Sequence, residues 1–388
     1  MQRPTLGLNR WDMTTPASFA ADVAHAETLG WGQALVLCNP LMTWDPYVVL
    51  ALAGQATANI GLAPFIDNPV LRDPAILANS ISTVDSIAPG RARLVLGVGD
   101  TAVRFLGKRP ATVAELESAV VRARALLASD SVEVGSTRPA HLHDPRPVPV
   151  WVAAGGPRTI QMAGRSADGL YLRAGRHPAN LQRAVEAIRL GATEADRPAD
   201  VGVGLVLHTI TSQKPDEISS ISRSMAAGFY EYSPGLFEAA GIPWDGPPLK
   251  DLKRQVWPDF HHAPDLKASG ECVSFLPEEA ANGFSLFGTP SDIADQLRSA
   301  IAAVGMVDVV VPHPVPTPLP GSDFPAGSPM RYGPLSESTG YGLPRVTVCP
   351  PRCQRCGWRR RRSDGEHRSI DGHMCLEFVS TPAGRFGS

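Results

Sequence analysis

The stretch Leu94-Val95-Leu96-Gly97-Val98-Gly99-Asp100 carries the clearest structural signal in the chain. Its apolar residues predict a buried strand, and the glycines that follow predict a turn whose backbone approaches a ligand closely. The same order recurs at Val150-Trp151-Val152-Ala153-Ala154-Gly155-Gly156-Pro157, where a strand leads into the start of a helix. A helix N-terminus binds phosphate groups well. Two strand ends of this kind predict that several strands deliver their carboxyl ends to one bound molecule.

Strand and helix patterns alternate along most of the remaining chain, which is typical of βα units around a parallel sheet. Strands are expected near residues 4–9, 33–38, 60–65, 92–97, 149–153, 168–172, 201–209 and 307–311. Helices are expected near residues 16–29, 45–57, 73–87, 112–128, 157–165, 178–191, 218–230 and 290–304. Eight strands with intervening helices predict an α/β fold, a closed (β/α)8 TIM barrel within residues 1–320.

Helix starts support this arrangement. Asp45-Pro46 and Asp73-Pro74 each place a carboxylate before a proline, a pattern that favours the first turn of a helix. Thr289-Pro290-Ser291-Asp292 adds an early carboxylate to the same pattern. We interpret all three as helix initiation rather than as ligand contacts.

A long segment, residues 211–288, separates the seventh strand from the last helix and is rich in proline and aromatic residues. An insertion after the carboxyl end of a barrel strand lies over the mouth, where TIM barrels carry their active sites. We interpret this insertion as a lid and substrate pocket. A packing module or a dimer surface is the alternative.

The last part of the chain, residues 321–388, is rich in arginine, cysteine and proline and lacks the βα pattern. We interpret it as a disordered, low-complexity tail or as the product of a reading-frame artefact. Cys349, Cys353 and Cys356 lie close together there, but their spacing fits no paired zinc knuckle. No metal site is therefore expected.

Composition excludes several classes of protein. The chain has 388 residues, 43% of them hydrophobic, and a formal net charge of -2. This balance offers no electrostatic footprint for nucleic acid, and no apolar stretch reaches the length of a membrane span. Most of the six cysteines fall in the tail, which argues against a disulfide framework. A cytoplasmic protein is expected, with neither nucleic acid nor membrane as a partner.

Further motifs, taken in order, resemble the bacterial-luciferase-like superfamily of flavin and deazaflavin oxidoreductases over residues 5–312. Residues 24–31, Ala-His-Ala-Glu-Thr-Leu-Gly-Trp, are similar to the family's first helix, and residues 72–74, Arg-Asp-Pro, to its Arg-x-Pro helix start. Residues 83–91, Thr-Val-Asp-Ser-Ile-Ala-Pro-Gly-Arg, resemble its turn before strand four. Gly155-Gly156-Pro157 resembles its phosphate-side motif, in the form typical of the branch that uses the deazaflavin coenzyme F420 and includes methylenetetrahydromethanopterin reductase.

The resemblance implies a cofactor site at the barrel mouth. It places a non-proline cis peptide at Phe65-Ile66, beneath the ring of the cofactor, and phosphate near Arg158. The residues expected to bind cofactor are Cys38, Phe65, Ile66, Gly97, Val98, Gly99, Ala154, Gly155, Gly156 and Arg158. Arg165, near the end of a helix, is interpreted as a structural ion-pair partner.

The chain departs from the family after its second strand. Deazaflavin enzymes commonly carry an acidic residue and a histidine there, whereas this chain has Cys38-Asn39. Asn39 donates hydrogen bonds but does not exchange protons near neutral pH. We interpret Cys38 as a buried small hydrophobe. Asn39 and His208, which ends the seventh strand, are the candidate catalytic residues.

The sequence is compatible with three alternative functions. The first is an oxidoreductase that transfers a hydride between a reduced deazaflavin or flavin and a small organic substrate. The second is a monooxygenase that uses flavin mononucleotide (FMN) to activate oxygen, with a separate reductase as a partner. The third is a noncatalytic barrel that has lost its cofactor. The resemblance also implies a homodimer.

Overall fold

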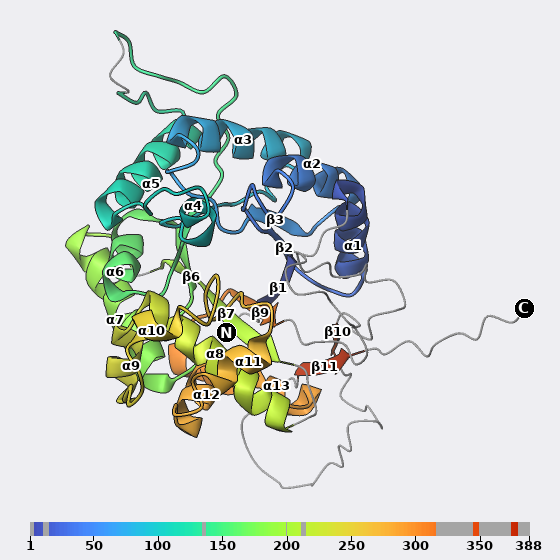
Figure 1. Ribbon diagram of the computed structural model, residues 1–388. Coiled ribbons are helices and arrows are strands. Elements are labelled where there is room, and N and C mark those ends of the chain that lie inside the picture. The colour runs from blue at the N-terminus through green and yellow to red at the C-terminus, as the bar shows by residue number, and fades with distance from the viewer. Residues whose placement is uncertain are drawn as a thin grey trace, which may run out of the picture.

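Eight parallel strands form a ring in the computed structural model, and helices surround it (Figure 1). The order β3-β2-β1-β9-β7-β6-β5-β4 confirms the predicted barrel. The strands are β1 Thr5–Arg10, β2 Gln33–Val36, β3 Gly61–Pro64, β4 Leu94–Leu96, β5 Val150–Ala154, β6 Gly169–Leu172, β7 Gly202–Ile210 and β9 Val309–Pro314. The structure describes residues 4–10, 15–133, 137–198, 200–210, 215–315, 344–348 and 374–378.

The ring closes between β3 and β4 through short bridges rather than a continuous ladder. Leu62 bridges to Ala92, and Asp67 bridges to Leu96. The backbone N–H of Asp67 donates to the Val95 carbonyl at 3.1 Å, and the N–H of Gly97 donates to the Asp67 carbonyl at 2.9 Å. The segment after β3 is therefore held directly against the glycine turn that follows β4.

Helices surround the ring of strands, and three of them begin at the predicted capping residues. The surrounding helices are α1 Pro16–Thr28, α2 Pro46–Ala56, α3 Pro74–Ile87, α4 Thr101–Arg104, α5 Val113–Leu127, α6 Pro157–Ser166, α7 Pro178–Glu194 and α13 Pro290–Val304. The Asp45 carboxylate caps α2, the Asp73 carboxylate caps α3, and Thr289 forms a capping box with Asp292 at α13. These caps satisfy backbone N–H groups that a helix start leaves free. The interpretation of the three sequences as helix starts is confirmed.

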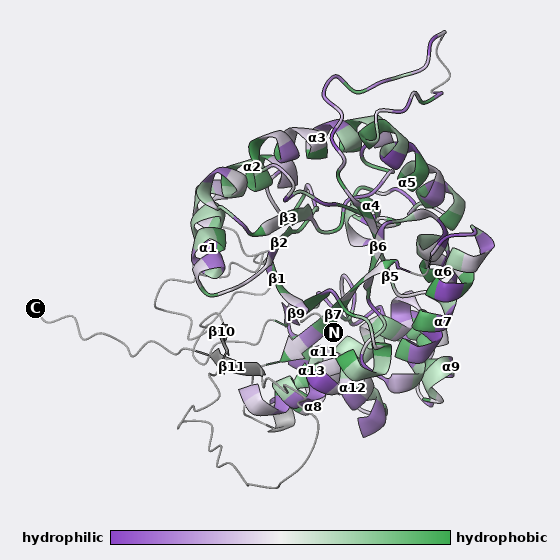
Figure 2. Cartoon of the chain, turned by 180° about the vertical axis from the view of Figure 1, so that it is seen from behind, coloured by the Kyte–Doolittle hydropathy of each residue, from purple (hydrophilic) through white to green (hydrophobic). Residues whose placement is uncertain are grey.

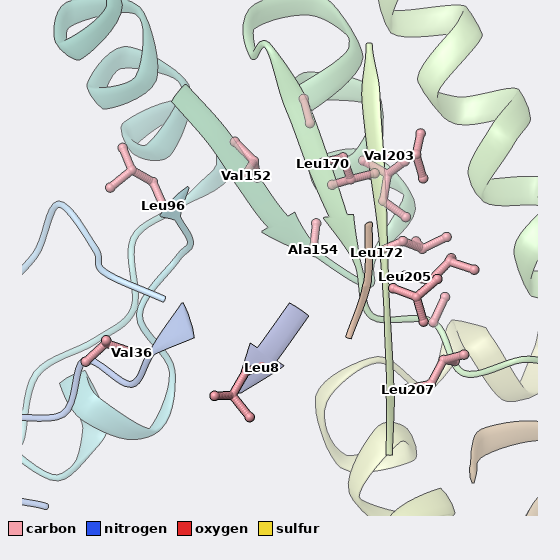
Figure 3. Packing of buried hydrophobic residues seen from close by; sticks show 14 of the residues in the cluster. Leu8, Val36, Leu96, Val152, Ala154, Leu170, Leu172, Val203, Leu205 and Leu207 are labelled. Atoms are coloured by element: carbon pink, nitrogen blue, oxygen red, sulfur yellow. The ribbon is translucent and has the colours of Figure 1, made fainter. Parts of the chain in front are cut away.

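Two apolar layers hold the barrel together. The outer layer lies between strands and helices, where Val152, Leu170 and Leu205 belong to one large buried cluster (Figure 3). Figure 2 shows hydrophobic residues on both the strands and the surrounding helices. A separate inner cluster fills the barrel and includes Trp151 and Tyr171.

The two inner aromatic rings require glycine on β7. A Cβ atom at Gly202 would lie 2.5 Å from the Trp151 ring, and one at Gly204 would lie 2.5 Å from the Tyr171 ring. Arg93 stacks over Trp151, 3.8 Å from the ring centroid, and donates to the Tyr171 hydroxyl at 2.9 Å. Side chains thus fill the barrel interior, so a ligand must bind at the mouth of the barrel.

The insertion forms a group of helices beside β7 and β9 (Figure 1). It contains α8 Pro215–Tyr232, α9 Gly235–Ala240, α10 Leu249–Leu252, α11 Leu266–Glu271, α12 Glu278–Phe284 and the short strand β8 Ser285–Phe287. Strand β8, which the sequence pattern did not predict, pairs in parallel with the end of β7.

The tail contains one described feature, an antiparallel pair of β10 Pro344–Val348 and β11 Met374–Phe378. The pattern of the tail did not predict these strands. Its remaining residues, with Cys349, Cys353 and Cys356, lie outside the described residues. No helix in the described part of the chain combines the length and the apolar character needed to cross a membrane.

Replacing Gly202 with alanine is expected to lower the free energy of unfolding by about 1–3 kcal/mol, because the new methyl group overpacks the Trp151 ring. The same change should cost less in a Trp151→Phe background, which removes the ring atoms that the methyl group meets. Urea denaturation of the four proteins of this cycle measures the coupling. Equal costs in both backgrounds would contradict the packing described here.

Candidate functional site

The peptide bond between Phe65 and Ile66 is cis, as predicted. The Phe65 ring packs edge-on against Tyr171, with ring centroids 5.2 Å apart. The Ile66 side chain faces the β4 turn, where a Cβ atom on Gly97 would lie 2.8 Å from its Cγ2. Glycine is therefore needed at position 97 to let these two strand ends meet.

A buried carboxylate lies next to this cis peptide, and the sequence analysis did not identify it. The Asp67 side chain is 1% exposed and accepts hydrogen bonds from the Tyr47 hydroxyl, the Arg72 guanidinium and the Asn68 backbone N–H, at 3.0, 3.0 and 2.8 Å. Burial raises the pKa of Asp67, while the charge of Arg72 and the hydrogen bonds act against that rise. These contacts fix the loop that carries Phe65 and Ile66.

The β4 turn needs glycine for its own conformation and packing. Gly99 has φ +79°, a conformation that favours glycine. A Cβ atom there would lie 2.5 Å from the Val103 side chain. The Val98 carbonyl accepts from the Ala111 N–H at 2.8 Å, and Asp100 forms an ion pair with Arg104.

The end of β5 leads into a helix start that no side chain among the described residues caps. Gly155 packs so closely on the chain after β6 that a Cβ atom would lie 2.3 Å from the Arg173 carbonyl oxygen. Gly156 is the N-cap of α6 and offers no side chain to the first turn. An added Cβ atom at Gly156 meets nothing nearer than the Ser233 hydroxyl at 3.7 Å. Arg158 is exposed in that first turn. An anion fits this position.

Cys38 and Asn39 lie in the loop after β2. The Cys38 thiol is buried 3.4 Å from the Val36 carbonyl, and burial together with the charge of Asp67 raises its pKa well above the ordinary value. The thiol is thus a poor nucleophile. The Asn39 side-chain oxygen accepts from the Leu41 N–H at 3.1 Å, so only its amide N–H groups remain to contact a ligand.

Three histidines meet on the opposite side of the mouth. His208 on β7 is in register with His313 on β9, and their ring centroids are 5.2 Å apart. His261 comes from the insertion, and its ring centroid lies 4.6 Å from that of His208. Phe229 of α8 packs against both His208 and His261. His208 and His313 lie together because they end neighbouring strands. No local sequence pattern predicted the position of His261.

The hydrogen bonds of this cluster leave ring nitrogens available. The Asn9 amide donates to His313 Nδ1 at 2.6 Å, and His261 Nε2 donates to the Met225 carbonyl at 3.0 Å. The Nδ1 atoms of His208 and His261 are buried and have no hydrogen-bond partner within the described residues. Among those residues, no three acidic, cysteine or histidine side chains are arranged to hold a metal ion.

Burial keeps these imidazoles neutral. It lowers the pKa of His208 well below 6.5, and the neighbouring His261 and His313 lower it further. Burial also lowers the pKa of His261 and of His313 to about 3. At neutral pH each ring therefore carries one N–H donor and one acceptor nitrogen.

A cavity of about 780 Å³ opens at the mouth. The loop after β2, the segment around α4 and the insertion all line it, which agrees with the interpretation of the insertion as a pocket wall. Its lining residues are Leu41, Thr101, Arg104, Phe105, Glu231, Tyr232, Leu249, Lys253, Trp257, Pro258 and Asp259. Arg165 lies away from this lining and forms a paired ion bridge with Glu117, at 2.7 and 2.9 Å, as predicted.

Comparison with known proteins gives a consistent result. The family model described as luciferase-like monooxygenase matches residues 9–307. A 5,10-methylenetetrahydromethanopterin reductase from Methanopyrus kandleri is 28% identical over 343 residues, which cover 81% of this chain and 94% of the reductase.

Solved structures share the fold. The coenzyme F420-dependent tetrahydromethanopterin reductase of Methanopyrus kandleri aligns with a TM-score of 0.64 and 23% identity, over 80% of this chain and 93% of that one. The oxygenating constituent of 3,6-diketocamphane monooxygenase from Pseudomonas putida, solved with FMN, aligns with a TM-score of 0.53 and 15% identity, over 80% and 92%.

The neutral His261 predicts acid sensitivity. The unfolded chain takes up a proton near pH 6.5, whereas the folded chain resists protonation down to about pH 3. Stability from this group is therefore intact above pH 6.5 and falls as the pH drops, by up to about 1.4 kcal/mol per pH unit. His261→Gln, which retains an amide donor, should flatten the dependence of unfolding free energy on pH between 6 and 4.

Urea denaturation at several pH values measures this slope. Val206→Ala serves as the control, because it removes buried volume from the same barrel without removing a titratable group, and it should lower stability equally at each pH. An unchanged slope in His261→Gln would contradict the neutral state of the buried ring.

Proposed function

The chain belongs to the luciferase-like monooxygenase family and is an oxidoreductase, and from this premise we propose that it transfers a hydride between coenzyme F420 and a small organic substrate. The observation that carries the proposal is the continuity of three strand ends. The Phe65-Ile66 bulge, the Gly97–Gly99 turn and the Gly156 helix start follow β3, β4 and β5, which are neighbours around the ring. Together they offer a surface for a molecule that has a flat ring and, farther along, a phosphate group.

The residues present fit such a cofactor. Gly97 and Gly99 leave the backbone of the β4 turn without side chains, and Ile66 provides an apolar surface beside it. The N-terminus of α6 offers backbone donors to a phosphate, with Arg158 as a nearby cation. When bound, the deazaflavin supplies hydride chemistry at its C5 carbon.

The protein's own part is to bind, orient and shield. Cys38, Phe65 and Val98 provide apolar contacts around the ring, and Ala154 and Gly155 lead the chain to the phosphate. His208 presents a neutral imidazole on the far side of the mouth, and its Nδ1 atom has no hydrogen-bond partner within the described residues. We assign it to holding the substrate by hydrogen bonds rather than to shuttling protons as an imidazolium.

Asn39 is the second residue assigned to the substrate or to the cofactor ring. Its side-chain oxygen is taken by the loop, so it acts as a donor through its amide N–H groups. The family resemblance extends the proposal to a homodimer in the cytoplasm. A separate reductase partner applies only to an FMN-dependent enzyme.

Titration of the purified protein with oxidised F420 and with FMN, followed by fluorescence and absorbance, tests the proposal. We expect saturable binding of F420 at least tenfold tighter than that of FMN. Tighter binding of FMN would instead support the monooxygenase alternative, since FMN has a similar flat ring and phosphate. A folded protein that binds neither would support the noncatalytic alternative.

The phosphate position has a test of its own. Arg158→Gln is expected to weaken F420 binding several-fold, because an exposed charge contributes modestly to phosphate binding. The same variant should bind the phosphate-free ribityl deazaflavin as well as the wild type does. Arg189→Gln, a change of another arginine on the next helix, α7, is the matched control. Equal loss for both ligands in Arg158→Gln would argue against phosphate at α6.

A further inference from the structure

Arg173 is an unusual residue at the barrel mouth. It follows the last residue of β6 and is half-buried, and its guanidinium forms no hydrogen bond or ion pair within the described residues. Its charge interacts electrostatically with Tyr232, Asp100 and Asp259. Burial lowers its pKa, which reflects incomplete compensation of the charge. A half-buried guanidinium without a partner is costly unless a ligand supplies one.

The nearby carboxylates already have partners of their own. Asp100 pairs with Arg104, and Glu231 pairs with Lys253. The Asp259 carboxylate accepts from His262 Nδ1 at 2.8 Å and from the His261 and His262 backbone N–H groups, both at 2.9 Å. Asp100 and Glu231 thus form ion pairs with other cations, and hydrogen bonds satisfy Asp259, so none of these carboxylates forms an ion pair with Arg173.

The histidine cluster adds hydrogen-bonding capacity to this charge. His208, His261 and His313 all interact electrostatically with Arg173. The rings of His208 and His261 each retain a buried Nδ1 atom without a partner. A ligand with an anionic oxygen and a hydroxyl donor satisfies both the cation and these acceptors.

The cavity above this pocket has an apolar rim. Leu41 is 60% exposed and Trp257 is 72% exposed, and both line the cavity. The Trp257 ring is nearly parallel to that of Phe105, with an interplanar angle of 2° and centroids 6.1 Å apart. Tyr232 and Asp259 line the same cavity and also interact electrostatically with Arg173, so the cation lies close behind the wall of this cavity. Aromatic side chains of this kind bind flat apolar groups.

We propose that the substrate is a molecule with a flat apolar body and a carboxylate or comparable anionic oxygen group, which Arg173 binds beneath the Phe105–Trp257 rim. The inference rests on the proposed function, since it names the substrate class of the same site. The anionic group belongs to the substrate and not to the cofactor, whose phosphate is assigned to α6. The body of the substrate then lies between the rim and the cofactor ring, which covers the surface formed by Ile66 and Val98.

Calorimetric titration with benzoate and with benzamide tests this assignment, because the two probes have similar shapes and differ in charge. In the wild-type protein loaded with F420, benzoate should bind at least tenfold tighter than benzamide. Arg173→Met, which keeps most of the side-chain volume, should abolish this preference, and Arg173→Lys should retain part of it. Arg189→Met on α7 is the control and should leave the preference intact.

Affinity for F420, measured on the same proteins, separates this inference from the proposed function. Normal F420 binding with no preference for benzoate in the wild type would overturn the assignment of Arg173 and leave the cofactor proposal standing. A loss of F420 affinity in Arg173→Met that is absent with the phosphate-free deazaflavin would place the cofactor phosphate at Arg173 and also overturn it. The comparison of probes in the wild type stands even if a variant does not fold.

Discussion

The contact between the end of β3 and the end of β4 is the constraint on which the site depends. The strands meet there through a few backbone hydrogen bonds, the last of which run from the Asp67 N–H to the Val95 carbonyl and from the Gly97 N–H to the Asp67 carbonyl. This contact closes the ring and also sets the Phe65-Ile66 bulge against the β4 turn. Because Gly97 has no side chain, Ile66 occupies the place that a Cβ atom would need. Closure of the barrel and the surface that we propose for the cofactor therefore depend on the same contact.

Polar groups outside the barrel interior hold this contact in place. Tyr47 of α2 and Arg72 of the loop before α3 both contact Asp67. Because the Asp67 carboxylate is buried, these protein groups take the place of water as its hydrogen-bond donors. A buried charge with hydrogen bonds of good geometry fixes one arrangement of its loop. The opposite side of the mouth is built differently, from neutral imidazoles and one guanidinium that forms no ion pair within the described residues. We propose that the first side holds the rigid ring of the cofactor and that the second offers hydrogen bonds and charge to the substrate.

Much of the fold was predictable from local patterns. Each predicted strand overlaps an observed one, since periodicity and helix caps act over a few residues. The cis peptide at Phe65-Ile66 was predicted through the family resemblance and is confirmed. The role of Asp67 was not predicted, because its partners Tyr47 and Arg72 come from different loops and helices. The position of His261 beside His208 was not predicted, since a long insertion places its side chains by tertiary packing. The roles assigned to Asn39, His208 and the glycine turns remain predictions.

A crystal structure of the protein soaked with oxidised F420 tests the central claim most directly. The ring is predicted to lie against Phe65 and Ile66, with the phosphate at the N–H groups that follow Gly156. A ring bound outside the barrel mouth, or a phosphate held on the side of His208 and His313, would contradict the claim that the β3, β4 and β5 ends form the cofactor site.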